Sequence, residues 1–429
     1  MTAYSNTRDF ALLQDQNDSL STFRQEFYHP IINGREAIYF TGNSLGLQPR
    51  VTQDYVLAEL EDWATYGVEG HFHGRNPWYS YQDILTNQLA TLLGALPIEV
   101  VSMNSLTTNL HLLLVSFYRP TKERHKIICE YDAFPSDLYA VQSQASYHGY
   151  NPDEAVVYLK AREGEYLLRT EDIIAAIERE GNSLATVMLG AVNYYTGQFL
   201  DLEKISAAAH KVGATVGFNL AHATGNVMMK LHEWNVDYAC FCSYKYLNAG
   251  PGGVSGIFVH ERFADDKSIP RFAGWWGNDP ETRFSIPRTF VPARGARSWQ
   301  LSNAPVISMA ALKASLDIFE DAGMDELRAK SEKLTGFLEF IIQDINREFK
   351  ASTGVEPVKI ITPSNPAERG CQLSLIMHSN GKKIHEKLTE KGVITDWREP
   401  DVIRAAPAPL YNSFMDVYEF GQFLKESIL

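Results

Sequence analysis

One lysine of the sequence stands where its amine is suited to covalent chemistry. Lys245 follows an apolar run, 238–242, that reads as a buried strand, and it directly precedes a loop rich in glycine and proline that extends to Gly253. Glycine lets a ligand or other backbone come close, and an amine at the end of a strand can form a Schiff base with a carbonyl group. A solvated lysine after an edge strand has the same spacing, so this segment alone leaves both interpretations open.

Two polar residues end another apolar strand upstream. Asn219 and His222 follow the run 215–218. A polar side chain at a strand tip can face the ring of a cofactor, although an amide that caps the next helix fits this segment equally well.

A helix start and an aromatic residue add to this pattern. The stretch 104–111 supplies hydroxyls and backbone N–H groups at the start of an apolar helix, which suits a phosphate, although ordinary N-capping has the same appearance. Phe134 precedes another helix start, where it can stack on a planar ring or pack in the core. A lysine, an anion site, an aromatic residue and polar strand tips together suit pyridoxal 5'-phosphate.

The elements that must position these residues alternate along the chain. Strands that are apolar on both faces and are separated by helices predict an α/β fold with a mostly parallel sheet, whose ligands bind at the carboxyl ends of the strands. We expect strands at 126–129, 155–159, 185–189, 215–218 and 238–242, and helices at 137–148, 171–179 and 202–212. Long helices at 309–322 and 325–349 and a mixed segment after 358 predict a smaller α+β domain. The expected division is an N-terminal arm (1–50) that packs on the small domain, a large cofactor-binding domain (51–305) and a small C-terminal domain (306–429).

Composition excludes several classes of protein. The 429 residues carry a net charge of -13, which disfavours nucleic acid and anionic membranes as partners. No leader-like start and no long apolar stretch is present, so we expect a cytoplasmic protein. The four cysteines are too few for a disulfide framework, and His71 and His73, two residues apart without a cysteine or carboxylate partner, are a poor metal site. We expect no metal.

Motifs spread over nearly the whole chain give it a family resemblance. The sequence resembles the kynureninases, within the fold type I, aspartate-aminotransferase-like pyridoxal-phosphate enzymes. The motifs are YFTGNSLGLQP (39–49), GHFHG (70–74) with PW (77–78), AFPSD (133–137), YYTGQ (194–198), LAH (220–222), SYKYLN (243–248), GWWG (274–277) and APAPLYNSF (406–414).

The resemblance implies a role for each matched residue. Lys245 would be the Schiff-base lysine, and Tyr244, a second catalytic residue, would bind the cofactor phosphate. The implied cofactor-binding set also contains Leu106, Thr107, Phe134, Asp137, Asn219, His222, Trp275 and Asn303, and the substrate-binding set contains Ser44, His71, Asn303 and Arg404. Arg404 would bind the substrate α-carboxylate, which suits a planar bidentate donor. Trp275 and Asn303 would come from the neighbouring subunit, so the resemblance implies a homodimer with shared active sites.

The implied reaction is hydrolysis of L-kynurenine, or of its 3-hydroxy form, to anthranilate or 3-hydroxyanthranilate and L-alanine. Lys245, once freed, would act as general base at the α-carbon of this amino acid substrate. Two alternatives stay open: an altered pyridoxal-phosphate lyase or aminotransferase-like enzyme, and a non-catalytic protein that binds aryl amino acids. A cysteine desulfurase fits poorly, because Cys371 reads as part of an apolar strand, 372–376, rather than of a mobile loop.

Asn219 departs from the family pattern. The resemblance implies an aspartate at this position, whose carboxylate keeps the pyridine nitrogen of the cofactor protonated. A neutral amide in its place forfeits about 1 to 2 kcal/mol, or about one decade of rate. Three explanations follow: Asp137 takes over as the charged partner, the asparagine was introduced to trap an intermediate, or the chain is a natural relative with different chemistry.

Overall fold

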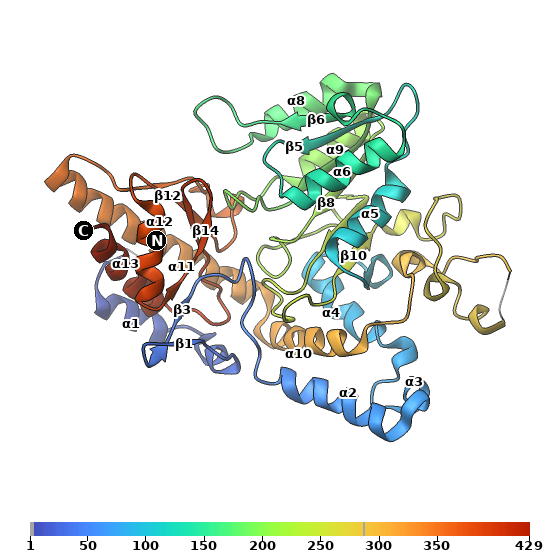
Figure 1. Ribbon diagram of the computed structural model, residues 1–429, viewed down its shortest axis with the longest axis horizontal. Coiled ribbons are helices and arrows are strands. Elements are labelled where there is room, and N and C mark those ends of the chain that lie inside the picture. The colour runs from blue at the N-terminus through green and yellow to red at the C-terminus, as the bar shows by residue number, and fades with distance from the viewer. Residues whose placement is uncertain (1–3, 286–287) are drawn as a thin grey trace.

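The larger part of the protein is built around one sheet. The computed structural model describes residues 4–285 and 288–429 (Figure 1). Within these residues seven strands pair in the order β4-β10-β9-β8-β7-β5-β6. Their bounds are β4 Val100–Ser102, β5 Lys126–Glu130, β6 Val156–Leu159, β7 Leu184–Gly190, β8 Thr215–Asn219, β9 Tyr238–Phe241 and β10 Gly256–Val259. The neighbours from β9 to β6 are parallel and β10 is antiparallel to both of its neighbours, so the predicted mostly parallel sheet is confirmed.

Helices cover the sheet because each has one apolar stripe. In α8 (Thr170–Glu180) the buried residues Ile173, Ala176 and Ile177 recur at the spacing of one helix face. The other helices of this part are α2 Thr52–Tyr66, α3 Gly70–His73, α4 Asp83–Leu93, α5 Leu106–Phe117, α6 Pro135–Tyr147, α7 Pro152–Ala155 and α9 Leu202–Lys211. The helices predicted at 137–148, 171–179 and 202–212 are therefore confirmed, with small shifts at their ends.

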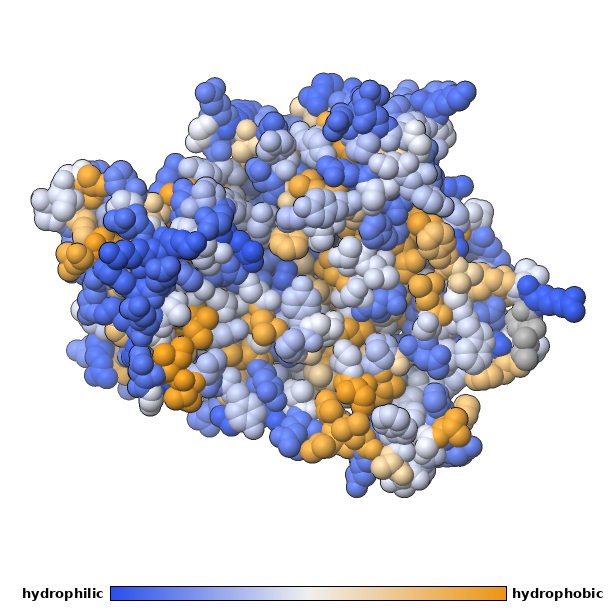
Figure 2. All heavy atoms as spheres, viewed as in Figure 1, coloured by the Kyte–Doolittle hydropathy of each residue, from blue (hydrophilic) through white to orange (hydrophobic). Residues whose placement is uncertain are grey.

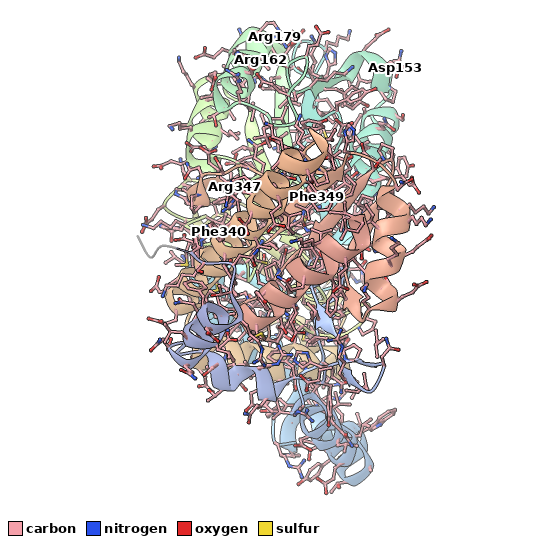
Figure 3. The ribbon with its side chains drawn as sticks, turned by 90° about the vertical axis from the view of Figure 1, so that its left-hand side faces the viewer. Asp153, Arg162, Arg179, Phe340, Arg347 and Phe349 are labelled. Atoms are coloured by element: carbon pink, nitrogen blue, oxygen red, sulfur yellow. The ribbon has the colours of Figure 1, made fainter. Side chains whose placement is uncertain are left out.

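The C-terminal part has its own, antiparallel sheet. Four strands pair in the order β11-β12-β15-β14: β11 Val358–Ile360, β12 Leu373–Met377, β15 Val402–Ala405 and β14 Asp396–Arg398. The helices of this part are α11 Met324–Thr353, α12 Gly381–Glu390 and α13 Phe414–Ile428. Helix α10 (Val306–Ala322), which the sequence assigned to the small domain, packs on α2 and α4 of the larger part instead. Along α11 the guanidinium carbon of Arg347 lies 5.8 Å from the centroid of the Phe340 ring (Figure 3). Cys371 precedes β12 instead of lying in it, which corrects the predicted strand by one residue at its start.

The first residues return to the C-terminal part. Helix α1 (Arg8–Gln16) packs on α13, and β3 (Ile38–Tyr39) pairs in parallel with β13 (Val393–Ile394) (Figure 1). A short hairpin of β1 (Ile31–Ile32) and β2 (Arg35–Glu36) precedes β3. Residues 1–3 of the predicted arm lie outside the described residues. This pairing brings Ser44 next to β14 and β15, far away in the sequence.

No helix among the described residues is long and apolar enough to cross a membrane.

Candidate active site

A cavity of about 310 Å³ opens where the parallel strands end. Glu130, Gly190 and Asn219, the last residues of β5, β7 and β8, all line it. This is the edge where open parallel sheets bind their ligands. The lining contains eight of the residues named from the sequence: Leu106, Thr107, Phe134, Asp137, Asn219, His222, Tyr244 and Lys245. A larger open groove of about 1490 Å³ lies between segments 164–171 and 356–365, and none of the predicted site residues lines it.

Lys245 and His222 form the reactive pair of this cavity. The Lys245 Nζ lies 3.0 Å from the Nε2 of His222. Burial lowers the pKa of Lys245, and burial, followed by the charge of Lys245, lowers the pKa of His222 well below its usual value. Burial thus favours the neutral amine, which is the nucleophilic form. The buried Nδ1 of His222 has no hydrogen-bond partner among the described residues.

Asp137 and Asn219 form the floor of the cavity. The Nδ2 of Asn219 donates to both carboxylate oxygens of Asp137, at 2.9 and 2.8 Å, and its Oδ1 accepts from the N–H of Ala221 at 2.9 Å. Burial raises the pKa of Asp137 to about 6, against the hydrogen bond from Asn219 and the charge of Lys245. The structure therefore places Asn219, the residue that departs from the family pattern, in direct contact with Asp137, the acid that could compensate for it.

The start of α5 offers an anion site. Asn104 has a φ of 48°, which turns the chain from β4 into the helix, and asparagine tolerates this backbone conformation. Its side chain donates to Asn109 Oδ1 at 3.1 Å, and Asn109 donates to the carbonyl of Met103 at 2.8 Å, which holds the turn. Among the described residues, no side chain accepts a capping hydrogen bond from the N–H groups at this helix start. They can therefore bind a phosphate.

A cluster of charged side chains, Asp396, Arg398 and Arg404, lies beside the cavity, and we call it the charged wall. Asp396 on β14 and Arg404 on β15 are cross-strand partners and their side chains form an ion pair. Arg404, only 1% exposed, also donates to the carbonyl of Tyr194 at 2.7 Å and to Ser44 Oγ at 3.2 Å. Arg398 donates to the same Asp396 oxygen at 3.1 Å. Burial acts to raise the pKa of Asp396, but the two arginines and Ser44 outweigh it, so its pKa lies below the usual value.

Five predicted residues do not line the cavity of their own chain: Ser44 and Arg404 lie beside it in the charged cluster, and His71, Trp275 and Asn303 lie elsewhere. His71 lies on α3, where its Nδ1 is 2.9 Å from the carbonyl oxygen of Val68. Trp275 is 51% exposed and donates to the carbonyl of Arg283, and Asn303 is exposed. Within one chain the structure therefore does not bring these last three residues to Lys245.

Sequence reasoning missed Glu130, Asp396 and Arg398. Burial raises the pKa of Glu130 to about 8, and its Oε1 accepts from the N–H of Gly190 at 2.8 Å. The sequence did contain a signal for Glu130, because it is a polar residue directly after the apolar run 126–129. The alternation Asp396-x-Arg398 was the signal for the charged wall, because residues two apart on a strand face the same side.

A second cluster of histidine and carboxylate groups lies away from the cavity. Glu99 lies 2.9 Å from His232 and 3.6 Å from His260, and its oxygens accept the N–H groups of Leu96 and Glu261, both at 2.7 Å. These bonds satisfy the buried carboxylate and tie together three loops. We assign this cluster a structural role.

Two family models match overlapping parts of the chain. Residues 38–352 match the family model described as aminotransferase class-V, and residues 327–424 match the kynureninase C-terminal domain.

Curated relatives match the full length. The chain is 52% identical over 426 residues to the kynureninase of Flavobacterium johnsoniae, with 99% of both chains covered. It is 53% identical to the kynureninase of Myxococcus xanthus (98% and 97% covered) and 48% identical to that of Nematostella vectensis (97% and 93% covered).

Solved structures with lower identity share the fold. A mutant of C-DES with glycine covalently linked to the PLP cofactor superposes with a TM-score of 0.75 at 18% identity, over 90% of this chain and 96% of that one. A cysteine desulfurase from Escherichia coli gives a TM-score of 0.73 at 16% identity, over 96% and 98% of the two chains. The predicted fold, a mostly parallel sheet flanked by helices with a smaller C-terminal domain, is confirmed.

Proposed function

This chain belongs to the kynureninase family, and we infer that it hydrolyses L-kynurenine, or its 3-hydroxy form, to the corresponding anthranilate and L-alanine. The observation that carries this inference is the match to curated kynureninases at about 50% identity over the full length. The cavity supports it, because a buried lysine and an anion site line it, and the buried Arg404 lies beside it, hydrogen-bonded to Tyr194 of the lining.

The residues of the cavity fit pyridoxal phosphate, the cofactor of this family. Three observations support this fit: among the described residues the start of α5 has no side-chain cap, the buried Nδ1 of His222 has no hydrogen-bond partner, and the amine of Lys245 is buried. We propose that the N–H groups of Leu106 and Thr107, with the Tyr244 hydroxyl, hold the phosphate. Phe134 and His222 would border the ring. When bound, the cofactor supplies the electron sink that makes cleavage of a carbon–carbon bond possible.

Lys245 would do the proton chemistry at the substrate. Its amine, whose neutral form burial favours, would hold the cofactor through its carbonyl carbon and, once free, would take the proton from the α-carbon of the substrate. His222, 3.0 Å away, stays neutral because it is buried, so it can accept a hydrogen bond from the ammonium that forms.

Arg404 would orient the substrate. Its guanidinium is held by Tyr194, Ser44 and Asp396, which leaves its direction little freedom. The cluster holds two arginines and one aspartate, so a net positive charge remains to attract the α-carboxylate. Fixing the substrate in this way lowers the entropy lost in the reaction.

We also propose a homodimer in which the second copy completes each site. Trp275 and Asn303 are exposed in one chain. Apolar side chains on and after α2 are also exposed, among them Trp63 (62%), Val68 (73%) and Phe72 (54%). Figure 2 shows apolar residues gathered in the lower part of the view, where Figure 1 places α2, α3 and α10. A surface of this kind indicates a protein interface.

Mass measurement by light scattering tests the dimer. A particle of twice the 48.3 kDa chain mass is expected. A Trp63→Glu variant should dissociate, whereas Leu429→Glu, an exposed control at the C-terminus, should not. A monomeric parent with full activity would contradict the shared site.

Steady-state turnover of L-kynurenine tests the function itself. We expect release of fluorescent anthranilate and of alanine. The Asn219→Asp variant is measured beside the parent, and a rise of about tenfold in it would show that the neutral amide limits the rate. Release of a different product would favour the altered lyase or aminotransferase-like enzyme. Tight binding of kynurenine without any product from either protein would favour the non-catalytic alternative.

A further inference from the structure

On the floor of the cavity the amide of Asn219 is hydrogen-bonded to the carboxylate of Asp137. Asp137 comes from the first turn of α6 and Asn219 from the last position of β8, and each is 7% exposed. They lie 82 residues apart in the sequence, yet both oxygens of the acid are bound by the one amide nitrogen. Because a carboxylate only accepts hydrogen bonds, it fixes the side of Asn219 on which the NH₂ group lies.

The amide oxygen of Asn219 consequently has a fixed direction as well. It accepts one hydrogen bond, from the N–H of Ala221 at 2.9 Å. A carbonyl oxygen can accept two hydrogen bonds, so one lone pair remains at a residue that lines the cavity. The negative charge behind the amide polarises it and makes this oxygen a stronger acceptor.

The floor also lacks a cation of its own. Among the described residues no arginine, lysine or histidine forms an ion pair with Asp137, and Lys245 acts on it only through its charge at longer range. The Asp137 carboxylate in turn raises the pKa values of four neighbouring groups, Glu130, Cys129, Cys240 and Cys242. None of these becomes positive, so a buried carboxylate faces the cavity without a partner charge.

We propose that Asp137 and Asn219 form one anionic unit, in which Asp137 supplies the charge and Asn219 presents it to the pyridine nitrogen of the bound cofactor. The unit would keep that nitrogen protonated although the residue at the strand end is neutral. This assignment rests on the proposed function only in requiring bound pyridoxal phosphate. Asp137 is a positioning residue that acts through Asn219.

Nitrogen-15 NMR of the holoenzyme, loaded with cofactor labelled at the ring nitrogen, tests the unit directly. The chemical shift distinguishes a protonated from an unprotonated nitrogen, and it is measured without turnover. In the parent we expect the protonated form at pH 7.5. Asp137→Asn removes the charge but keeps the shape, and it should convert the nitrogen to the unprotonated form and lower turnover about tenfold or more.

The double variant Asp137→Asn with Asn219→Asp is the matched control. It moves the single negative charge from position 137 to position 219 and keeps an acid–amide pair, so the protonated form should return. An unprotonated nitrogen in the parent, or an unchanged nitrogen in Asp137→Asn, would overturn the proposal. The absorbance band of cofactor bound to the lysine must be present in each variant. Its presence without release of anthranilate would contradict the proposed function and leave the anionic unit standing.

Discussion

Two aspartates, one buried and one partly buried, lie at and beside the cavity and have opposite surroundings. Asp137, on the cavity floor, is bound by one neutral amide, and burial raises its pKa to about 6. Asp396, on the small sheet, is bound by Arg398 and Arg404, and its pKa is lowered. Burial acts on both carboxyl groups in the same direction, so the difference comes from the cations.

This difference shows how the site divides its charges. The floor has a negative group without a cation, which suits a ligand that brings a positive charge. The wall has two cations for one acid, which suits a ligand that brings a carboxylate. An amino acid substrate and a pyridine cofactor together supply both groups, which is consistent with the proposal that the floor binds the cofactor and the wall binds the substrate.

Lys245 lies between the two regions, and its removal should have the largest effect. Lys245→Ala should lower kynurenine turnover at least about 10³-fold, because the Schiff base and the general base are lost together. Anthranilate fluorescence measures the loss, and the absorbance band of lysine-bound cofactor should disappear. Lys230→Ala, at an exposed lysine paired with Glu233, serves as the control and should keep full turnover.

Substituting the buried arginine of the wall comes next. Arg404→Lys should lower kcat/KM about 10²-fold, because a lysine cannot replace a bidentate guanidinium that is also held by Tyr194 and Ser44. Arg398→Lys is the matched variant at the more exposed arginine and should cost less than tenfold. Equal losses in the two variants would mean that the charge of the wall matters and the geometry of Arg404 does not.

Neutralising the wall acid should destabilise the protein. Asp396→Asn leaves two guanidinium groups without their carboxylate and should lower the free energy of unfolding by about 3 kcal/mol at pH 7. Because the folded-state pKa of Asp396 is depressed, its stabilisation exists above the unfolded pKa of about 4 and is lost as the pH falls through the folded value. Urea denaturation at pH 7 and at pH 3.5 should therefore show a smaller difference at the lower pH.

Neutralising Asp137, the acid of the cavity floor, should change the free energy of unfolding in the opposite direction and by a smaller amount. In cofactor-free protein, Asp137→Asn should raise the free energy of unfolding by about 1 to 2 kcal/mol at pH 7. The raised folded pKa, about 6, means that the wild-type protein loses stability as the pH rises from about 4 to 6, and the variant does not. The same denaturation series measures this gain. If both aspartate variants changed stability in the same direction, the contrast between the two regions would be wrong.

The sequence by itself determined the α/β fold and much of the floor of the site. Apolar runs such as 184–190, which the fold buries on both faces, alternate with helical segments, and this alternation predicts a covered, mostly parallel sheet. Because parallel strands end at one edge, the polar residues after them, among them Asn219, had to meet there. The spacing after the strand left two interpretations open for Lys245, and only the fold shows that it is buried and lines the cavity.

Only the tertiary structure decided which charges meet. Asn219 binds Asp137 across 82 residues, and Ser44 reaches Arg404 across 360 residues, because helix α6 packs on the sheet and the N-terminal segment pairs with β13. Local pattern predicts that a residue is buried or polar, but the pKa of a buried acid depends on the partner that packing places beside it. Asp137 and Asp396 therefore look alike in the sequence and differ in the fold, since one received an amide and the other two guanidinium groups.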